Sequence, residues 1–229
     1  MPPIRRVRQH VNPLSSKYAN PADAPDWRDI FADTQRPLHL DIGCGKGDFV
    51  REMASKVADW NFLGLEIREP LVERAIIRRD RAITEGADKN LHFVFCNANN
   101  SLKPLLKAWP NPEANGSALT CPFLPCPLKC VSIQFPDPWF KKRHQKRRVV
   151  QPELVAALAE LMPKDAWVWL QSDIEELCVA MCDRFDESPD FHRTDPNWLT
   201  ESPFPAKTDR EAVSEEKGLP VYRAKYIRQ

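Results

Sequence analysis

The chain has 229 residues, of which 42% are hydrophobic and 28% are charged, and these values fit one soluble domain with a buried core. The formal net charge is only +1, so the overall charge does not indicate a partner. A nucleic-acid site must therefore come from a local cluster of basic side chains. No apolar run reaches membrane-spanning length, the N-terminus lacks a signal-peptide core, and seven cysteines, an odd number, fit reduced thiols. We therefore expect an intracellular protein. The cytoplasm is the expected compartment, and the nucleus or an organelle is the alternative.

Residues 1–26 predict a basic, partly disordered N-terminal arm, followed by a single domain over 27–229. Five basic side chains precede the first acid, and they are Arg5, Arg6, Arg8, His10 and Lys17. Five prolines in the segment oppose a long helix. Such a segment is usually a solvated terminus, and the alternative is an arm that contacts phosphates.

An apolar run, Leu38–Ile42, leads into three alternating glycines, Gly43, Gly45 and Gly47, which predicts a strand, a tight turn and a helix. Asp41 closes the strand, and a carboxylate there would repel a pyrophosphate but suits an amino group or a sugar hydroxyl. The spacing also differs from the dinucleotide pattern G-x-G-x-x-G. D-x-G-x-G-x-G resembles the first motif of class I S-adenosylmethionine-dependent methyltransferases, with an ordinary strand-to-helix turn as the alternative.

The next two predicted strands, 61–65 and 92–95, are followed by polar side chains that suit a nucleoside. Glu66 ends the first of them about two dozen residues after the glycine turn, where a carboxylate can accept hydrogen bonds from a ribose diol. A surface glutamate is the alternative. Asn97 follows the second strand, where an adenine amino group is usually read.

Residues at about 110–130 interrupt this alternation and predict a loop insertion. Cys121, Cys126 and Cys130 invite a metal interpretation. However, no fourth ligand is near and the spacing is not C-x2-C, so we expect no metal.

The strand predicted at 131–135 leads into Pro136-Asp137-Pro138-Trp139, where two prolines fix the backbone around an acid. An acid between prolines and an aromatic ring can hold a flat base. The run 141–148 follows without a single acid. A charge run is usually a solvated surface, but its position beside a base-binding candidate predicts a patch that contacts phosphates.

The rest of the chain completes an α/β pattern. Asp173 follows a predicted strand, and we interpret it both as a helix N-cap and as a candidate site acid. Residues 207–211 are interpreted as a polar turn. The alternation predicts a doubly wound, mostly parallel seven-stranded sheet with an antiparallel C-terminal strand. The remaining predicted elements are helices near 70–83, 102–109, 152–162 and 174–185 and strands near 166–170, 191–194 and 221–226.

From about residue 10 to the C-terminus, the sequence resembles the tRNA (guanine-N(7)-)-methyltransferases of the TrmB type, which have the Rossmann-like class I methyltransferase fold. The most specific part of the resemblance is F-P-D-P-W-x-K-K-R-H over 135–144. The Asp41 glycine turn, the segment 64–67 and the segment 208–211 also match.

The resemblance implies that S-adenosylmethionine is held by Asp41, Glu66 and Asn97, with the turn from Gly43 through Gly45 to Gly47 around its methionine end. It implies that Asp137 is the active-site acid and also borders the cofactor. The implied substrate-contacting positions are Lys141, Asp173, Thr208, Asp209, Arg210 and Glu211. Members of the family often carry an aspartate at the position of Asn97.

The implied reaction is methyl transfer to nitrogen 7 of guanosine 46 in the variable loop of tRNA, without a metal. Two other classes stay open: a methyltransferase that acts on an exocyclic amino group of nucleic acid or on a small molecule, and a non-catalytic RNA-binding module. The assembly is also open, because relatives occur as monomers, as homodimers and, in eukaryotes, with a WD-repeat partner. No membrane partner is expected.

Overall fold

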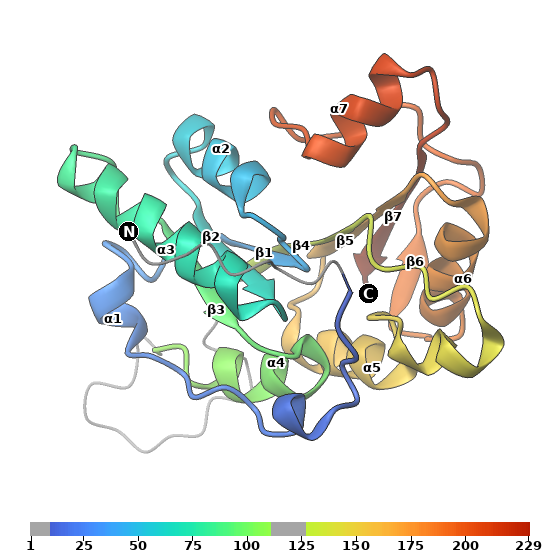
Figure 1. Ribbon diagram of the computed structural model, residues 1–229, viewed down its shortest axis with the longest axis horizontal. Helices are drawn as coiled ribbons and strands as arrows, with labels where there is room; N and C mark the ends of the chain where they lie inside the picture. Colours follow the sequence, from blue (N-terminus) through green and yellow to red (C-terminus); the bar gives the residue numbers. More distant parts are fainter. Residues whose placement is uncertain (1–9, 111–126) are drawn as a thin grey trace.

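A computed structural model describes residues 10–110 and 127–229 of the chain (Figure 1). The strands are β1 (Leu38–Ile42), β2 (Asn61–Glu66), β3 (Leu91–Phe95), β4 (Leu128–Gln134), β5 (Trp167–Ser172), β6 (Phe191–Arg193) and β7 (Tyr222–Arg228). The α-helices are α1 (Trp27–Ile30), α2 (Asp48–Lys56), α3 (Glu69–Thr84), α4 (Ala98–Lys107), α5 (Pro152–Leu161), α6 (Glu175–Asp186) and α7 (Asp209–Glu216). Two short 3₁₀ helices are η1 (Ser16–Tyr18) and η2 (Lys142–Arg147).

The strands form one seven-stranded sheet in the order β3-β2-β1-β4-β5-β7-β6. β7 runs antiparallel to β5 and β6, whereas the other neighbouring strands pair in parallel. The predicted α/β class, with a mostly parallel sheet and an antiparallel C-terminal strand, is therefore confirmed. The strand order reverses between β1 and β4, and in doubly wound sheets ligands bind beyond the carboxyl ends of the strands at such a point.

Helices cover both faces of this sheet, as Figure 1 shows for α2 and α3 on one side and for α4 and α5 on the other. Val50 of α2 and Val72 of α3 belong to a core cluster with Phe93 of β3. A second cluster joins the helices of the opposite face to Leu40 and Val131 in the central strands. Because both faces are covered, the parallel strands are buried along nearly their whole length rather than at alternate residues.

The interpretation of residues 207–211 as a turn is wrong, because α7 begins there. Thr208 is its N-cap, and its Oγ1 accepts a hydrogen bond from the backbone N–H of Glu211 at 3.1 Å. This pairing satisfies one of the N–H groups that a helix leaves unpaired in its first turn. The sequence pattern missed the helix because it is short and its outer face is polar.

Two other boundaries differ from the prediction. α4 begins at Ala98 rather than near 102, because the side chain of Asn97 caps it by accepting from the N–H of Asn99 at 3.1 Å. β4 begins at Leu128 rather than at 131, and Cys130 lies buried within it. Cys121 and Cys126 lie outside the described residues, as does most of the predicted loop insertion.

The described part of the N-terminal arm, residues 10–26, is held to the domain by hydrogen bonds. The Asn100 side chain donates to the carbonyl of Tyr18 at 2.7 Å, and the N–H of Ala22 donates to Ser101 Oγ at 3.0 Å. These contacts tie the arm to the first turns of α4. Within the described ranges, no helix is both long and apolar enough to cross a bilayer.

Replacing Gly47 by alanine is expected to lower the free energy of unfolding by about 2–4 kcal/mol. Gly47 has φ +77°, and a Cβ at this position would overlap the ring of Phe93. Gly218 is the matched control, because it has φ +63° but open space around the site of a Cβ. Its replacement by alanine should cost about 1–2 kcal/mol through backbone strain alone. Urea unfolding of both variants measures the difference, and equal losses would contradict a tight contact at Gly47.

Candidate functional site

The candidate site lies where the carboxyl ends of β1, β2 and β4 meet. Two adjoining cavities open there, and they share Gly43, Arg68 and Phe135 in their linings. The first cavity has about 760 Å³ of space, partly open to solvent, and reaches toward Glu66 and Asn97. The second extends from the glycine turn toward the start of α7. The reversal of strand order between β1 and β4 thus coincides with two adjoining hollows of the described chain.

Glu66 at the end of β2 holds the glycine turn in place. Its Oε2 accepts from the N–H of Gly45 at 2.9 Å and from Arg68 Nη2 at 3.1 Å. Its Oε1 accepts from the N–H and from Nε of Arg68, both at 2.9 Å. Burial alone would lower the pKa of Arg68, but the carboxylates of Glu66 and Asp137 raise it instead. A carboxylate has about four acceptor positions, so a diol can bind Glu66 only by replacing donors of the chain itself.

Asp41 is buried in β1 at the lining of the second cavity. Ser132 Oγ of the neighbouring strand donates to Asp41 Oδ1 at 2.5 Å, and His39 Nε2 lies 2.8 Å from the same hydroxyl. Burial raises the pKa of Asp41 to about 6, and the polar hydrogens of Ser132 and Gln134 oppose this rise. Burial also lowers the pKa of His39 to about 3. Neutral His39 therefore supports Ser132, which in turn orients the Asp41 carboxyl group.

The loop that carries Asp137 has an unusual backbone on either side of the acid. Phe135 has φ +47° and Trp139 has φ +43°, values in the left-handed region that bulky residues rarely adopt. Such conformations persist only where the surroundings hold them. The N–H of Phe135 donates to the carbonyl of Gln171 at 2.7 Å, which fixes one end of the loop to β5.

The other end of the Asp137 loop is held by the basic segment that follows it. Arg148 Nε donates to the carbonyl of Pro138 at 2.8 Å. The guanidinium of Arg147 lies 5.0 Å from the centre of the Trp139 ring, which is within range of a cation–π contact. Arg147 and Arg148 therefore help to hold the Asp137 loop in its conformation.

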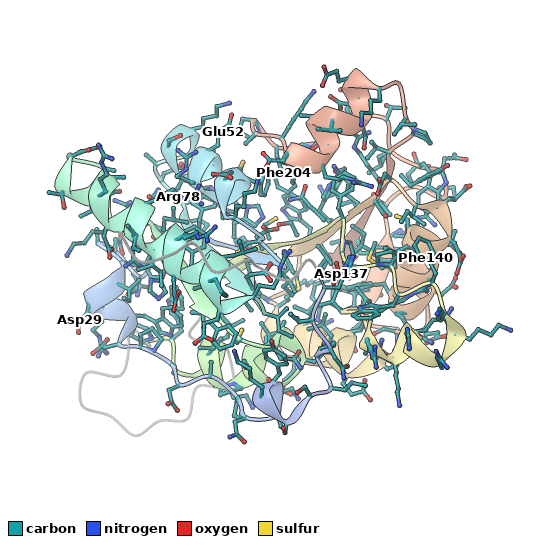
Figure 2. The ribbon with its side chains drawn as sticks, viewed as in Figure 1. Asp29, Glu52, Arg78, Asp137, Phe140 and Phe204 are labelled. Atoms are coloured by element: carbon teal, nitrogen blue, oxygen red, sulfur yellow. The ribbon has the colours of Figure 1, made fainter. Side chains whose placement is uncertain are left out.

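Asp137 itself lies on the lining of the first cavity, together with Glu66 and Gly43. Figure 2 shows it near the middle of the molecule, while the exposed Phe140 lies farther out. His10 of the arm contacts the acid, with Nδ1 2.8 Å from Asp137 Oδ1. The arm also contributes Val11 to this cavity. The arm thus closes one side of the cavity over its acid.

Asn97 joins this cavity to the arm. Besides capping α4, its Nδ2 donates to the carbonyl of Pro13 at 3.3 Å. Both Asn97 and Pro13 line the first cavity. An aspartate at position 97 would have no hydrogen to donate to Pro13 when ionised, so the amide found here suits this arm.

The start of α7 borders the second cavity through Thr208, Asp209 and Arg210. Arg210 Nε donates to Asp173 Oδ2 at 2.8 Å, and Lys46 Nζ donates to Asp209 Oδ2 at 3.0 Å. The expectation that Asp173 caps the following helix is wrong. The N-cap of α6 is Ile174, and the Asp173 carboxylate binds Arg210 instead.

The structure brings together most but not all of the predicted site residues. Those that line one of the two cavities are Asp41, Gly43, Gly45, Glu66, Asn97, Asp137, Thr208, Asp209 and Arg210. Gly47 instead starts α2, and Lys141 lies on the exposed surface beside the site. Glu211 points into the core, where its Oε1 accepts from Arg223 Nη2 at 2.8 Å. This pairing between α7 and β7 is structural and is not part of the cavity lining.

Sequence reasoning missed Arg68 and Gln134, which both line the second cavity. Arg68 follows Glu66 by two residues, and this E-x-R spacing at a strand end is a signal that the sequence already contains. Gln134 is the last residue of β4, next to the aromatic–proline–acid loop. Within the described ranges, no three His, Cys, Asp or Glu side chains lie close enough together to hold a metal ion.

Comparison with known proteins agrees with this geometry. A family model described as "Putative methyltransferase" matches residues 35–224. A tRNA (guanine-N(7)-)-methyltransferase from Synechococcus elongatus is 53% identical over 225 residues, which cover 98% of this chain and 97% of the relative. The protein of the same name from Trichormus variabilis is 48% identical over 227 residues, covering 99% and 97% of the two chains.

Solved structures support the fold alone, because their sequences are distant. The 16S rRNA methyltransferase KamB has a TM-score of 0.57 at 12% identity and covers 91% of this chain and 96% of its own. The aminoglycoside resistance methyltransferase NpmB1 has a TM-score of 0.53 at 14% identity, covering 86% of this chain and 89% of its own. With the family model and the near full-length relatives, this chain belongs to the tRNA (guanine-N(7)-)-methyltransferase family of class I S-adenosylmethionine-dependent methyltransferases.

Proposed function

We propose that this protein transfers the methyl group of S-adenosylmethionine to nitrogen 7 of a guanosine in tRNA, at position 46 of the variable loop. The observation that carries the proposal is the position of Asp137. It borders the same cavity as Glu66 and Gly43. An acid that can bind the guanine base therefore lies beside residues that can bind a nucleoside cofactor. The relatives, which are named for this reaction, support the same substrate.

The residues at the cavities fit S-adenosylmethionine by their chemistry. Glu66 offers a buried carboxylate at the end of β2, and Asn97 offers an amide that can accept a further hydrogen bond. Asp41 offers a second buried carboxylate toward the amino-acid end. A Cβ at Gly43 would meet no atom within 4 Å, so there is room above the turn. When bound, the cofactor supplies a methyl group on a positively charged sulfur.

The chain's own part in the reaction is to position the base and to stabilise charge. Nitrogen 7 of guanine carries a free lone pair, so no residue has to remove a proton from it. Asp137 can accept hydrogen bonds from the N1–H and amino groups of the base. It also opposes the positive charge that develops on the purine during transfer. His10, which contacts Asp137, is therefore not required as a base.

An exposed basic surface beside the Asp137 loop suits the tRNA backbone. Lys141, Lys142, Arg143 and Lys146 all project from η2 or its start into solvent. Within the described residues, no acidic partner is recorded for these four side chains, in contrast to Arg148, which lies 3.3 Å from Glu176. Unpaired cations next to a base-binding loop can neutralise phosphates while the loop contacts the base.

Neutralising this surface should reduce the salt dependence of tRNA binding. The variant Lys141→Gln, Lys142→Gln, Arg143→Gln is expected to lower the slope of log Kd against log salt by about 2–3, because each lost phosphate contact removes nearly one released counterion. Filter binding at several salt concentrations measures the slope. The control variant Lys103→Gln, Lys107→Gln, Lys164→Gln removes the same charge from α4 and from the turn before β5. An equal effect of both variants would contradict a local phosphate site.

The reaction itself is tested by incubating the protein with unmodified tRNA and methyl-labelled S-adenosylmethionine, followed by digestion and mass spectrometry of the nucleosides. We expect 7-methylguanosine, and a tRNA with adenosine in place of guanosine 46 should stay unlabelled. Label in an exocyclic methylamino nucleoside would instead support the alternative base-modifying activity. Cofactor binding without any labelled RNA would support a small-molecule substrate.

The same proposal places the protein in the cytoplasm, acting as a monomer or a homodimer. Light scattering of the purified protein during gel filtration, with and without tRNA, measures the assembly.

A further inference from the structure

Gln134 is a buried amide beside the Asp41 carboxyl group at the edge of the second cavity. The residue is 8% exposed at the end of β4. By ordinary hydrogen-bond geometry neither its Oε1 nor its Nε2 is paired among the described residues, although the amide lies near enough to Asp41 to oppose the rise in the pKa of that acid. An ionised carboxylate can only accept, so Asp41 can pair with Nε2 alone, and Oε1 is left without a donor among the described residues. Because buried amides are nearly always paired, this acceptor points to a donor from outside the chain.

The residue borders a hollow at the carboxyl end of its strand. Gln134 lines the second cavity together with Asp41 and Thr208. Ser132 pairs with Asp41 across β1 and β4, and Gln134 lies two residues beyond Ser132 on the same face of its strand. The Gln134 amide therefore lies beside the Asp41 carboxylate. Its dipole acts against the burial that raises the pKa of Asp41.

The two side chains together form a set of donors and acceptors that matches an amino acid. Asp41, when ionised, can only accept hydrogen bonds, and it supplies a negative charge. Gln134 supplies one carbonyl acceptor and two N–H donors. An ammonium group can lie between the Asp41 carboxylate and Gln134 Oε1, while Nε2 can donate to the neighbouring carboxylate of the same ligand.

We propose that Gln134 binds the α-amino-acid end of S-adenosylmethionine together with Asp41, and so selects ligands that carry this end. The inference rests on the proposed function for the identity of the ligand. Asp137 and Glu66 line the other cavity, so the base and the ribose have their own groups and leave Gln134 to the amino acid. The residue acts in binding and selection, and it takes no proton.

The variant Gln134→Met tests this, because methionine has similar volume and neither polar atom. Calorimetric titration of the parent and the variant uses S-adenosylmethionine, S-adenosylhomocysteine and 5′-methylthioadenosine, which lacks the amino acid. The affinity of the variant for the first two ligands should fall about 10- to 100-fold, as expected when hydrogen bonds to charged groups are lost. Its affinity for 5′-methylthioadenosine should stay within about twofold of the parent.

Gln171 provides the matched control, because it is a buried glutamine in register with Gln134 on β5 but outside both cavity linings. Its Oε1 accepts from Trp169 Nε1 at 2.9 Å. Gln171→Met should therefore lower the melting temperature and leave all three affinities unchanged. Gln134→Met should change the melting temperature of the ligand-free protein less than Gln171→Met does, since no hydrogen bond of ordinary geometry within the chain is lost.

An unchanged affinity of Gln134→Met for S-adenosylhomocysteine would overturn the inference, and so would an equal loss for all three ligands. Gln134→Leu serves as a second apolar variant if the first does not fold. If the proposed function is wrong, the experiments give a different result from the one that overturns this inference. A parent protein that binds S-adenosylmethionine but leaves tRNA unmethylated contradicts the proposed RNA substrate, and the comparison of ligands at Gln134 still decides this inference. A parent that binds none of the three ligands overturns both.

Discussion

The variant Asp137→Asn is expected to lower the rate of methyl transfer to tRNA by about 100- to 1,000-fold. Asparagine has nearly the same shape but carries no charge, so it cannot oppose the positive charge that develops on the purine. It also replaces one acceptor atom by a donor, which conflicts with the N–H groups of guanine. Single-turnover measurements with saturating tRNA and cofactor isolate the transfer step. A rate within about threefold of the parent would contradict the role given to this acid.

His10 provides the control for this experiment. Its Nδ1 lies 2.8 Å from Asp137 Oδ1, so the acid also holds the N-terminal arm over the cavity. If Asp137 acted only by holding the arm, His10→Ala would reproduce the loss of rate. Because the contact is half-exposed, we expect its removal to cost little and the rate of His10→Ala to stay within a few-fold of the parent. Comparing the two variants separates charge stabilisation from positioning of the arm.

The second large effect is expected at Glu66, where Glu66→Gln should weaken S-adenosylmethionine binding by about 2–3 kcal/mol, or roughly 30- to 150-fold. The neutral amide loses the charge that Arg68 pairs with, and it puts a donor where Gly45 and Arg68 require an acceptor. The ribose hydroxyls then lose a carboxylate partner, and the glycine turn loses its anchor. Isothermal titration calorimetry measures the affinity directly.

Glu69→Gln is the matched control for Glu66. Glu69 lies three residues further along the chain, and its Oε2 is 2.8 Å from Lys17 Nζ at the surface. It lies outside the lining of both cavities. Its neutralisation should leave cofactor affinity unchanged, because exposed ion pairs contribute little. Equal affinities of Glu66→Gln and the parent protein would remove Glu66 from the nucleoside site.

The relation between sequence and structure differs from one part of the site to another. The glycine turn at 43–47 and the loop around Asp137 were predicted because each is a local pattern with a local physical cause. Glycine permits the positive φ values at the turn, and proline restricts the backbone next to the acid. The same patterns located Glu66 at a strand end, since strand and acid are adjacent in the chain.

The positions of α7 and Asp173 show where local patterns are insufficient. Residues 207–211 look like a turn because they are polar, yet Thr208 caps a helix that begins there. The buried pair of Glu211 with Arg223 fixes that helix to β7. Asp173 has the composition of an N-cap, but its carboxylate binds Arg210 from α7 instead. The partners of Glu211 and Asp173 both come from elements that a local pattern does not bring together.

The sequence by itself determined the order of the strands and of most helices, the class of fold and the location of the glycine turn and the Asp137 loop, because these follow from periodicity and from neighbouring residues. Only the tertiary structure decided that His10 contacts Asp137, that Arg68 pairs with Glu66 and that the Gln134 amide lies beside Asp41. The reason is physical. Hydrogen bonds and ion pairs at the site depend on which strand ends and loops the sheet brings together. No local sequence pattern specifies that packing.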